Sequence, residues 1–328
     1  MTNPVITVTL NPAVDDMLFL EQLEPRTKNI VRQRTSFVGG KGFNMARALA
    51  AQGVPVTALG FVGANEQDTF GASLKADGAH PVLVPISYTR HNLKIVETKT
   101  GHETELNERG ASVTGDQWVS FQKEYAAALL ALATTCGASS GTAARWVALT
   151  GSVPPGLKPA VYADLIRAAR SNAVCSLLDA SGEPLRLGLE GIPDAVHVNC
   201  HELAELAGVP VDSPAAAARA VQSWLDRGTQ SVLVSLGAQG ALLVSREGSW
   251  QARPPELQAV NAVGAGDTLC AGYLAACLQA RPPAEALRWA VALASASVLT
   301  PEPARFDSAK ARDLCAHTTV EPCRSNFY

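Results

Sequence analysis

A glycine-rich turn at the start of an apolar segment has the residue types needed to handle a phosphoryl group: Gly264, Ala265, Gly266 and Asp267. Small residues allow a tight turn whose N–H groups point at one spot, beside the partial positive charge of a helix N-terminus. Asp267 at that place can take a proton from an attacking hydroxyl. An ordinary turn with Asp267 as N-cap explains these residues equally well. Neither the dinucleotide-binding glycine pattern nor a Walker P-loop is present.

A second glycine-rich turn opens a helix at Gly39, Gly40, Lys41, Gly42, Phe43 and Asn44. Lys41 supplies a positive charge for a phosphate, and Asn44, one turn into the helix, can hydrogen-bond hydroxyl groups. A structural turn with an exposed lysine is the alternative interpretation.

Charged and amide residues in two other segments suit a polar, anionic ligand. Asp15 ends the segment 11–15, which follows the first expected strand, and ligands of open parallel sheets bind at the carboxyl ends of strands. Arg90, Asn92 and Lys94 alternate on an expected strand, so their side chains share one face, as a phosphate site would need. Taken alone, Asp15 is more typical of a turn, and the strand face can equally be a solvated one.

Two further strand ends suit a nucleotide and its metal. Asn199 and Glu202 open a helix and can lie near Mg²⁺, with contact through bound water because magnesium keeps several of its waters. A capping box, with Asn199 as N-cap and Glu202 at N3, is the alternative and is favoured on these two residues alone. Ser235, Gly237 and Gly240 follow another strand, where glycines allow close approach of a ligand.

No zinc site is expected. His201 and Glu202 do not begin a His-Glu-x-x-His pattern, and His197 and His201 lack a clear third ligand. The seven cysteines include no Cys-x-x-Cys pair and their number is odd, which favours reduced thiols in a cytoplasmic protein.

Composition excludes several classes of protein. The chain has 328 residues, 47% of them hydrophobic and 17% charged, with a formal net charge of −3. A nucleic-acid partner is not expected because lysine and arginine are not clustered. No apolar run reaches the roughly 18 residues of a membrane span, and no signal peptide is evident at 1–10. These features predict a cytoplasmic α/β protein without a membrane partner.

Strands and helices alternate along most of the chain, which predicts βαβ units and a mostly parallel sheet covered by helices on both faces. Expected strands are 5–10, 56–62, 82–86, 90–98, 103–107, 146–149, 174–179, 195–199, 231–236, 241–245 and 249–253. Expected helices are 43–52, 68–76, 116–133, 160–169, 183–190, 201–207, 214–227, 267–279, 284–298 and 308–316. The segments 11–37 and 87–108 break the alternation and are expected to pair as a small accessory sheet.

Together these segments resemble the PfkB, or ribokinase-like, carbohydrate kinases, and within them the 1-phosphofructokinase and tagatose-6-phosphate kinase branch. The resemblance extends from Thr9 to about residue 300. It rests on the two glycine-rich turns and on four more segments in order, at 9–12, 104–108, 151–156 and 179–183. The segment 260–272 resembles the second PfkB signature.

The resemblance implies a three-layer α/β core (1–10, 38–86 and 109–328) with a discontinuous β-sheet lid (11–37 and 87–108) that closes over the substrate and excludes water. It implies an ATP-dependent kinase for a phosphorylated ketohexose, fructose 1-phosphate or tagatose 6-phosphate, with Mg²⁺. Asp267 would be the base and the backbone of 264–266 an anion hole. The implied sugar ligands are Asp15, Gly39, Gly40, Asn44, Asn92 and Ser152, and the implied ligands of its phosphate are Lys41, Arg90 and Lys94. Ser235, Gly237 and Gly240 would line the nucleotide site, with Asn199 and Glu202 ordering Mg²⁺. Relatives suggest a homodimer.

The sequence departs from this pattern at two places. His197-Val198-Asn199 stands where the branch usually has Lys-Pro-Asn, and 299–303 lacks the glycine-bearing loop often found beside the purine. The expected nucleotide pocket is therefore altered. A kinase of an unphosphorylated sugar or nucleoside, and a non-catalytic sugar-phosphate sensor on the same fold, remain alternatives.

Overall fold

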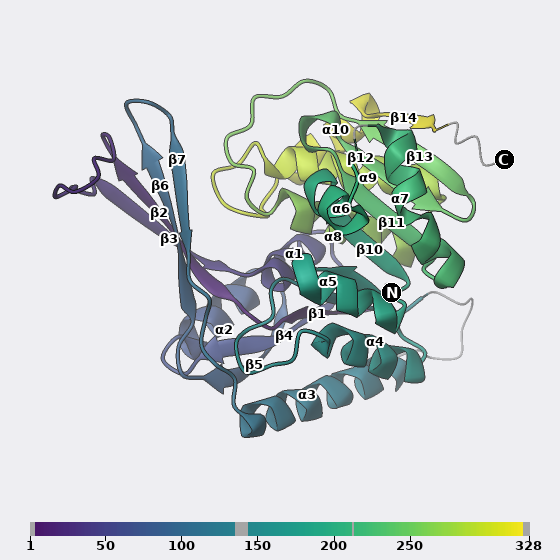
Figure 1. Cartoon of the computed structure of the whole chain (residues 1–328), viewed down its shortest axis with the longest axis horizontal. Helices are drawn as coiled ribbons and strands as arrows, with labels where there is room; N and C mark the ends of the chain where they lie inside the picture. Colours follow the sequence, from purple (N-terminus) through teal and green to yellow (C-terminus); the bar gives the residue numbers. More distant parts are fainter. Residues whose placement is uncertain (1–3, 135–143, 212, 324–328) are drawn as a thin grey trace.

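A computed structural model describes residues 4–134, 144–211 and 213–323 (Figure 1). Cys136 and the outermost residues of the expected core, 1–3 and 324–328, lie outside this part of the chain. Among the described residues, no helix is both long and apolar enough to cross a bilayer.

The main sheet is mostly parallel, as predicted. Its strand order is β14-β13-β12-β11-β10-β9-β8-β1-β4-β5. The strands from β11 to β5 pair in parallel, while β12, β13 and β14 continue the sheet antiparallel. Their bounds are β1 Val5–Thr9, β4 Val56–Gly63, β5 His80–Ile86, β8 Trp146–Thr150, β9 Cys175–Asp179, β10 Ala195–Asn199, β11 Ser231–Ser235, β12 Ala241–Ser245, β13 Gly248–Arg253 and β14 Thr319–Pro322. Most of the central strands are apolar on both faces because helices cover both.

Helices form a layer on each face of this sheet. Alternate residues of β1 divide between two hydrophobic clusters: Ile6 and Val8 face one layer, and Val5 faces the other. The first layer is α3 Gly115–Thr134, α4 Val161–Ser171, α5 Gly182–Gly188, α6 Cys200–Ala207 and α7 Pro214–Arg227. The second is α1 Lys41–Ala50, α2 Gln67–Ala76, α8 Ala265–Leu278 and α9 Pro283–Ser297, with α10 Ser308–His317 packed outside α9. The three-layer architecture is confirmed.

Four strands make a separate sheet that projects from the core in Figure 1. Its order is β3-β2-β6-β7, with bounds β2 Ala13–Leu20, β3 Gln33–Gly39, β6 Arg90–Glu97 and β7 Glu103–Asn107. We call these four strands the lid sheet. They come from the two segments that interrupt the alternation of strands and helices.

Several element boundaries differ from the predicted ones. β1 ends at Thr9, so Asp15 lies inside lid strand β2 and not at the end of the first strand. Helix α1 begins at Lys41 rather than residue 43. Strand β14 was not predicted, because its four mostly exposed residues become a strand only by pairing with β13.

Candidate active site

Two helices begin side by side at the carboxyl end of the sheet, and each begins at a glycine with positive φ. Gly264 has φ 79°, and a Cβ there would lie 2.9 Å from the backbone nitrogen of Ala304. Gly40 has φ 120°, and a Cβ there would lie 2.8 Å from the Thr9 side chain. Only glycine fits both positions, and the helices α8 and α1 that follow direct their first-turn N–H groups toward the same region.

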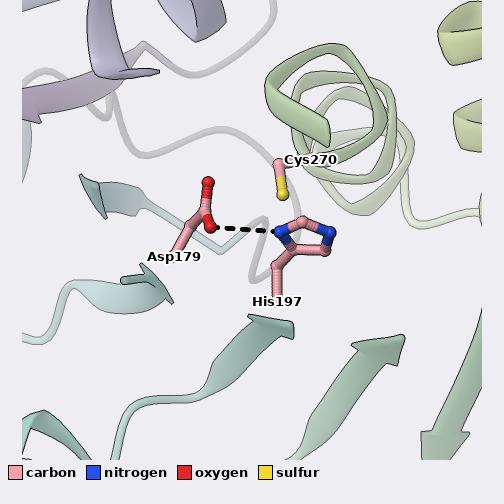
Figure 2. A group of neighbouring side chains, drawn as sticks. All are labelled: Asp179, His197 and Cys270. Atoms are coloured by element: carbon pink, nitrogen blue, oxygen red, sulfur yellow. Dashed lines mark hydrogen bonds and ion pairs between the residues drawn. The ribbon is translucent and has the colours of Figure 1, made fainter. Parts of the chain in front are cut away.

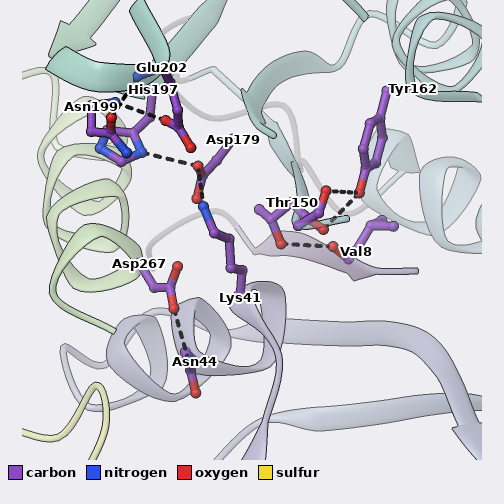
Figure 3. A network of polar contacts seen from close by, with 11 residues as sticks. Val8, Lys41, Asn44, Thr150, Tyr162, Asp179, His197, Asn199, Glu202 and Asp267 are labelled. Atoms are coloured by element: carbon purple, nitrogen blue, oxygen red, sulfur yellow. Dashed lines mark hydrogen bonds and ion pairs between the residues drawn. The ribbon is translucent and has the colours of Figure 1, made fainter. Parts of the chain in front are cut away.

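Asp267 is buried in the first turn of α8 and accepts a hydrogen bond from Asn44 of α1 (Figure 3). Asn44 Nδ2 lies 2.9 Å from Asp267 Oδ2. Burial raises the pKa of Asp267 to about 6, although the positive charge of Lys41 opposes the shift. A carboxylate with this pKa is matched to general-base work near neutral pH.

A chain of ion pairs and hydrogen bonds lies behind Asn44. Arg47 donates from NH1 to Asn44 Oδ1 (3.0 Å) and from Nε to Asp77 Oδ2 (2.7 Å). Arg305 reaches the other oxygen of Asp77 at 2.7 Å. The amide of Asn44 is thereby oriented with its NH₂ group toward Asp267. Sequence reasoning missed Arg47, Asp77 and Arg305, since no local pattern links them.

Lys41 makes an ion pair with a buried carboxylate of the core. Its Nζ lies 2.9 Å from Asp179 Oδ1 at the end of β9 (Figure 3). Burial alone would lower the pKa of Lys41, but Asp179 and Asp267 outweigh burial and raise it. Lys41 is therefore held as a cation beside Asp179 and Asp267.

The lid sheet contributes Asp15 and Asn92, which are register partners on β2 and β6. Asn92 Nδ2 donates to Asp15 Oδ1 at 2.8 Å, and burial raises the pKa of Asp15 although this hydrogen bond opposes the shift. Gly39 lies against the same carboxylate, where a Cβ would come within 2.0 Å of Oδ2. Asp15 and Gly39 are thus packed together, as a shared ligand surface requires.

Arg90 and Lys94, the two lid residues expected to bind the phosphate, both have protein partners. Arg90 donates to the carbonyl oxygens of Glu108 at 2.9 Å and Pro12 at 3.4 Å. Lys94 Nζ lies 2.7 Å from the carboxylate of Glu103, which is half exposed. A pocket between the lid sheet and the core contains Lys94 with a set of lid and core residues: Asp15, Asp16, Met17, Phe37, Asn92, Leu93, Glu105, Asn107, Asn261, Val263 and Pro303.

Ser152 lies just beyond β8, and the side chain of Asn11 fixes its hydroxyl by a hydrogen bond. Asn11 Nδ2 donates to Ser152 Oγ at 2.9 Å and to the carbonyl oxygen of Arg109 at 3.0 Å. Tyr162 supports the same strand end, because its hydroxyl donates to the carbonyls of Thr150 and Gly151. The structure therefore brings Ser152 to the same edge of the sheet as the turn of α1.

Asn199 and Glu202 form the capping box that was the alternative interpretation. Asn199 Oδ1 accepts from the Glu202 amide at 2.8 Å, and the Asn199 amide donates to Glu202 Oε2 at 3.0 Å. Beside this cap lies a pocket of about 400 Å³, large enough for a small-molecule ligand. Ser235 and Gly237 line it. Gly240 is placed differently: a Cβ there would lie 2.0 Å from the carbonyl oxygen of Ala252, so glycine is required for strand packing.

Comparison with known proteins decides the family. A model described as pfkB family carbohydrate kinase matches residues 8–309. The 1-phosphofructokinase of Escherichia coli K12 is 32% identical over 98% of this chain and 99% of its own. The 1-phosphofructokinase of Xanthomonas campestris is 36% identical over 85% of each chain. The chain belongs to the pfkB family of carbohydrate kinases.

Solved structures agree with this assignment to the pfkB family. Phosphofructokinase-2 from E. coli, crystallised with potassium, superposes with a TM-score of 0.85 at 26% identity, over 96% of this chain and 99% of the other. A possible 1-phosphofructokinase from Thermotoga maritima gives 0.83 at 25% identity, over 98% and 100%. This pfkB kinase therefore has the ribokinase-like fold, and its family membership makes it a carbohydrate kinase.

Proposed function

We propose that this pfkB kinase transfers the γ-phosphoryl group of ATP to the free primary hydroxyl of fructose 1-phosphate, with Asp267 as the general base. The observation that carries the proposal is the placement of Asp267: a buried carboxylate with a raised pKa, at a helix N-terminus, beside the permanent cation Lys41. The relatives named 1-phosphofructokinase favour fructose 1-phosphate over tagatose 6-phosphate.

Different residues of the proposed active site would act on the acceptor and on the transferred phosphoryl group. The acceptor hydroxyl would lie against Asp267, which removes its proton as the new P–O bond forms. The transferred phosphoryl group would meet the N–H groups of Ala265 and Gly266 and the ammonium of Lys41, which together oppose its negative charge. Lys41 is thus assigned to the transferred group, because its partners are Asp179 and Asp267.

The lid would hold the rest of the sugar phosphate. Asp15 and Asn92 already form a hydrogen-bonded pair that can accept and donate to sugar hydroxyls. Arg90 and Lys94 are the cations nearest to that pair on β6, and the existing phosphate of the substrate would replace Glu103 as the partner of Lys94. A phosphorylated acceptor explains two cations on this strand better than a neutral sugar does.

Mg²⁺ is expected with ATP. Oxygen ligands such as those of Asn199 and Glu202 suit this ion. The capping box engages the single side-chain oxygen of Asn199 and one of the two of Glu202, so the fit is through bound water. Bound there, Mg²⁺ would neutralise charge on the ATP phosphates. Ser235 and Gly237 would line the nucleotide site.

The test is ADP release from Mg-ATP with each of five acceptors: fructose 1-phosphate, tagatose 6-phosphate, fructose 6-phosphate, fructose and ribose. We expect kcat/KM to be highest for fructose 1-phosphate. Preference for tagatose 6-phosphate or fructose 6-phosphate would move the substrate within the class, and preference for fructose or ribose would refute the phosphate role of the lid cations. Ligand binding without ADP release from any acceptor would indicate a non-catalytic sensor.

A further inference from the structure

Three buried side chains with metal-ligand chemistry meet directly behind the proposed anion hole (Figure 2). They are Asp179 at the end of β9, His197 in β10 and Cys270, one turn beyond Asp267 in α8. One potential ligand atom from each lies within 4.8 Å of the other two. The expectation of no zinc site rested on the pair His197 and His201, whereas the fold places two other candidate ligand residues, from distant segments, beside His197.

The cluster has unsatisfied hydrogen-bonding capacity. Within the part of the chain that the structure describes, Asp179 Oδ2 and His197 Nε2 are buried polar atoms without a hydrogen-bond partner. Buried polar atoms normally have partners, and Asp179 Oδ2 is thus an oxygen that could take part in holding a cation. His197 faces Asp179 through Nδ1, and its Nε2 lies on the side of the ring away from Asp179 (Figure 2).

The spacing suits a tetrahedral cation. His197 Nδ1 lies 3.1 Å from Asp179 Oδ1. Zinc bonds of roughly 2.0–2.1 Å to nitrogen and oxygen place two tetrahedral ligands about 3.3 Å apart. Cys270 would add a sulfur ligand, since the candidate ligand atoms of all three residues lie within 4.8 Å of one another. Nitrogen, oxygen and sulfur together are typical ligands of Zn²⁺ and other thiophilic ions and are unsuited to Mg²⁺.

We propose that Asp179, His197 and Cys270 form a site for a thiophilic divalent cation such as Zn²⁺, and that the bound ion inhibits phosphoryl transfer. The ion would enter from the cleft by displacing the Lys41 ammonium, whose side chain is 40% exposed while that of Asp179 is 1% exposed. Lys41 would then lose its anchor. His197 also lies against the anion hole, since a Cβ on Gly266 would be 3.1 Å from its Cε1.

Binding is tested without reference to activity, because only the inhibition rests on the proposed function. The chelator-treated full chain is titrated with Co²⁺, and we expect one equivalent to produce a thiolate-to-cobalt charge-transfer band. Cys270→Ser should lose this band. Cys277→Ser, in the same helix, and Cys200→Ser, beside His201, are matched controls that should keep it. A band that survives in Cys270→Ser and vanishes in Cys200→Ser would overturn the site.

Inhibition is tested with Zn²⁺ added to the kinase in excess Mg-ATP. The Zn²⁺ concentration for half-inhibition should rise at least about 10-fold in Cys270→Ser, the smallest loss expected when even an indirect metal partner is removed. Should that variant fail to fold, zinc-edge X-ray absorption of the unaltered protein should show one sulfur ligand at about 2.3 Å. Ligation by nitrogen and oxygen alone would refute the proposal. If the acceptor panel shows no kinase activity, the cobalt and absorption results still decide the site.

Discussion

At the scale of single residues, opposing effects set the pKa of one carboxyl group, that of Asp267. Burial favours the neutral form of Asp267, while Lys41 and the hydrogen bond from Asn44 favour the charged form. The resulting pKa of about 6 leaves most of the carboxylate ionised at neutral pH yet still able to take up a proton.

Replacing Asp267 by Asn should lower kcat for the best acceptor at least ~10²-fold, the lower range for loss of a general base. The KM values for acceptor and ATP should change little, because the amide keeps the shape of the carboxylate. Steady-state kinetics check both. Turnover close to that of the unaltered protein would remove Asp267 from its proposed role.

The pH profile of kcat/KM for the acceptor should rise with pH through about 6 and then level off, since the ionised form of Asp267 is the base. In Lys41→Met the rise should move to higher pH, because the cation that most strongly lowers this pKa is gone. If kcat/KM of Lys41→Met reaches a lower plateau but rises at an unchanged midpoint pH, this electrostatic account is contradicted.

At the scale of elements, the starts of α1 and α8 must be held together for Asn44 to reach Asp267. The buried pair Arg47–Asp77 provides this connection, and Arg305 extends it to the segment after α9. Arg305 follows the residues 299–303, where the sequence departs from the expected purine-side loop, and its ion pair connects this segment to Asp77.

Arg47→Lys should reduce both stability and turnover. A lysine cannot donate to Asp77, Asn44 and the Val38 carbonyl at once, and breaking a buried ion pair costs about 3–5 kcal/mol, an upper limit here because Arg305 still pairs with Asp77. Arg305→Ala, which removes a half-exposed partner, should cost about 1 kcal/mol or less. Thermal unfolding and kcat check the pair of variants; equal losses in both would contradict the proposed role of Arg47.

At the scale of the whole molecule, the proposed reaction joins groups from two sheets. The lid sheet carries Asp15, Asn92, Arg90 and Lys94, whereas the proposed base and the proposed anion hole belong to the core. The pocket between them contains residues of both, including Lys94 from the lid and Asn261 from the core. A substrate with a phosphate at one end and a hydroxyl at the other would span this junction.

Lys94→Met should raise the KM for fructose 1-phosphate about 10-fold or more while leaving the KM for ATP unchanged, because a hydrogen bond to a charged group contributes about 1.5–3 kcal/mol. Lys99→Met, an exposed lysine between β6 and β7, is the matched control and should have no effect. If both variants bind the sugar phosphate as the unaltered protein does, the lid does not hold its phosphate.

The alternation of strands with helices was readable from the sequence because each element carries its own period of apolar residues. The two glycine-rich turns were readable because positive φ and close backbone approach restrict the residue type at Gly40 and Gly264. The connections between distant side chains were decided only by the tertiary structure. Asn44 and Asp267 are 223 positions apart, and Lys41 and Asp179 are 138 apart. The order of the strands brings such residues together, and no local pattern records that order. For the same reason the sequence showed His197 without ligands, while the fold places Asp179 and Cys270 beside it.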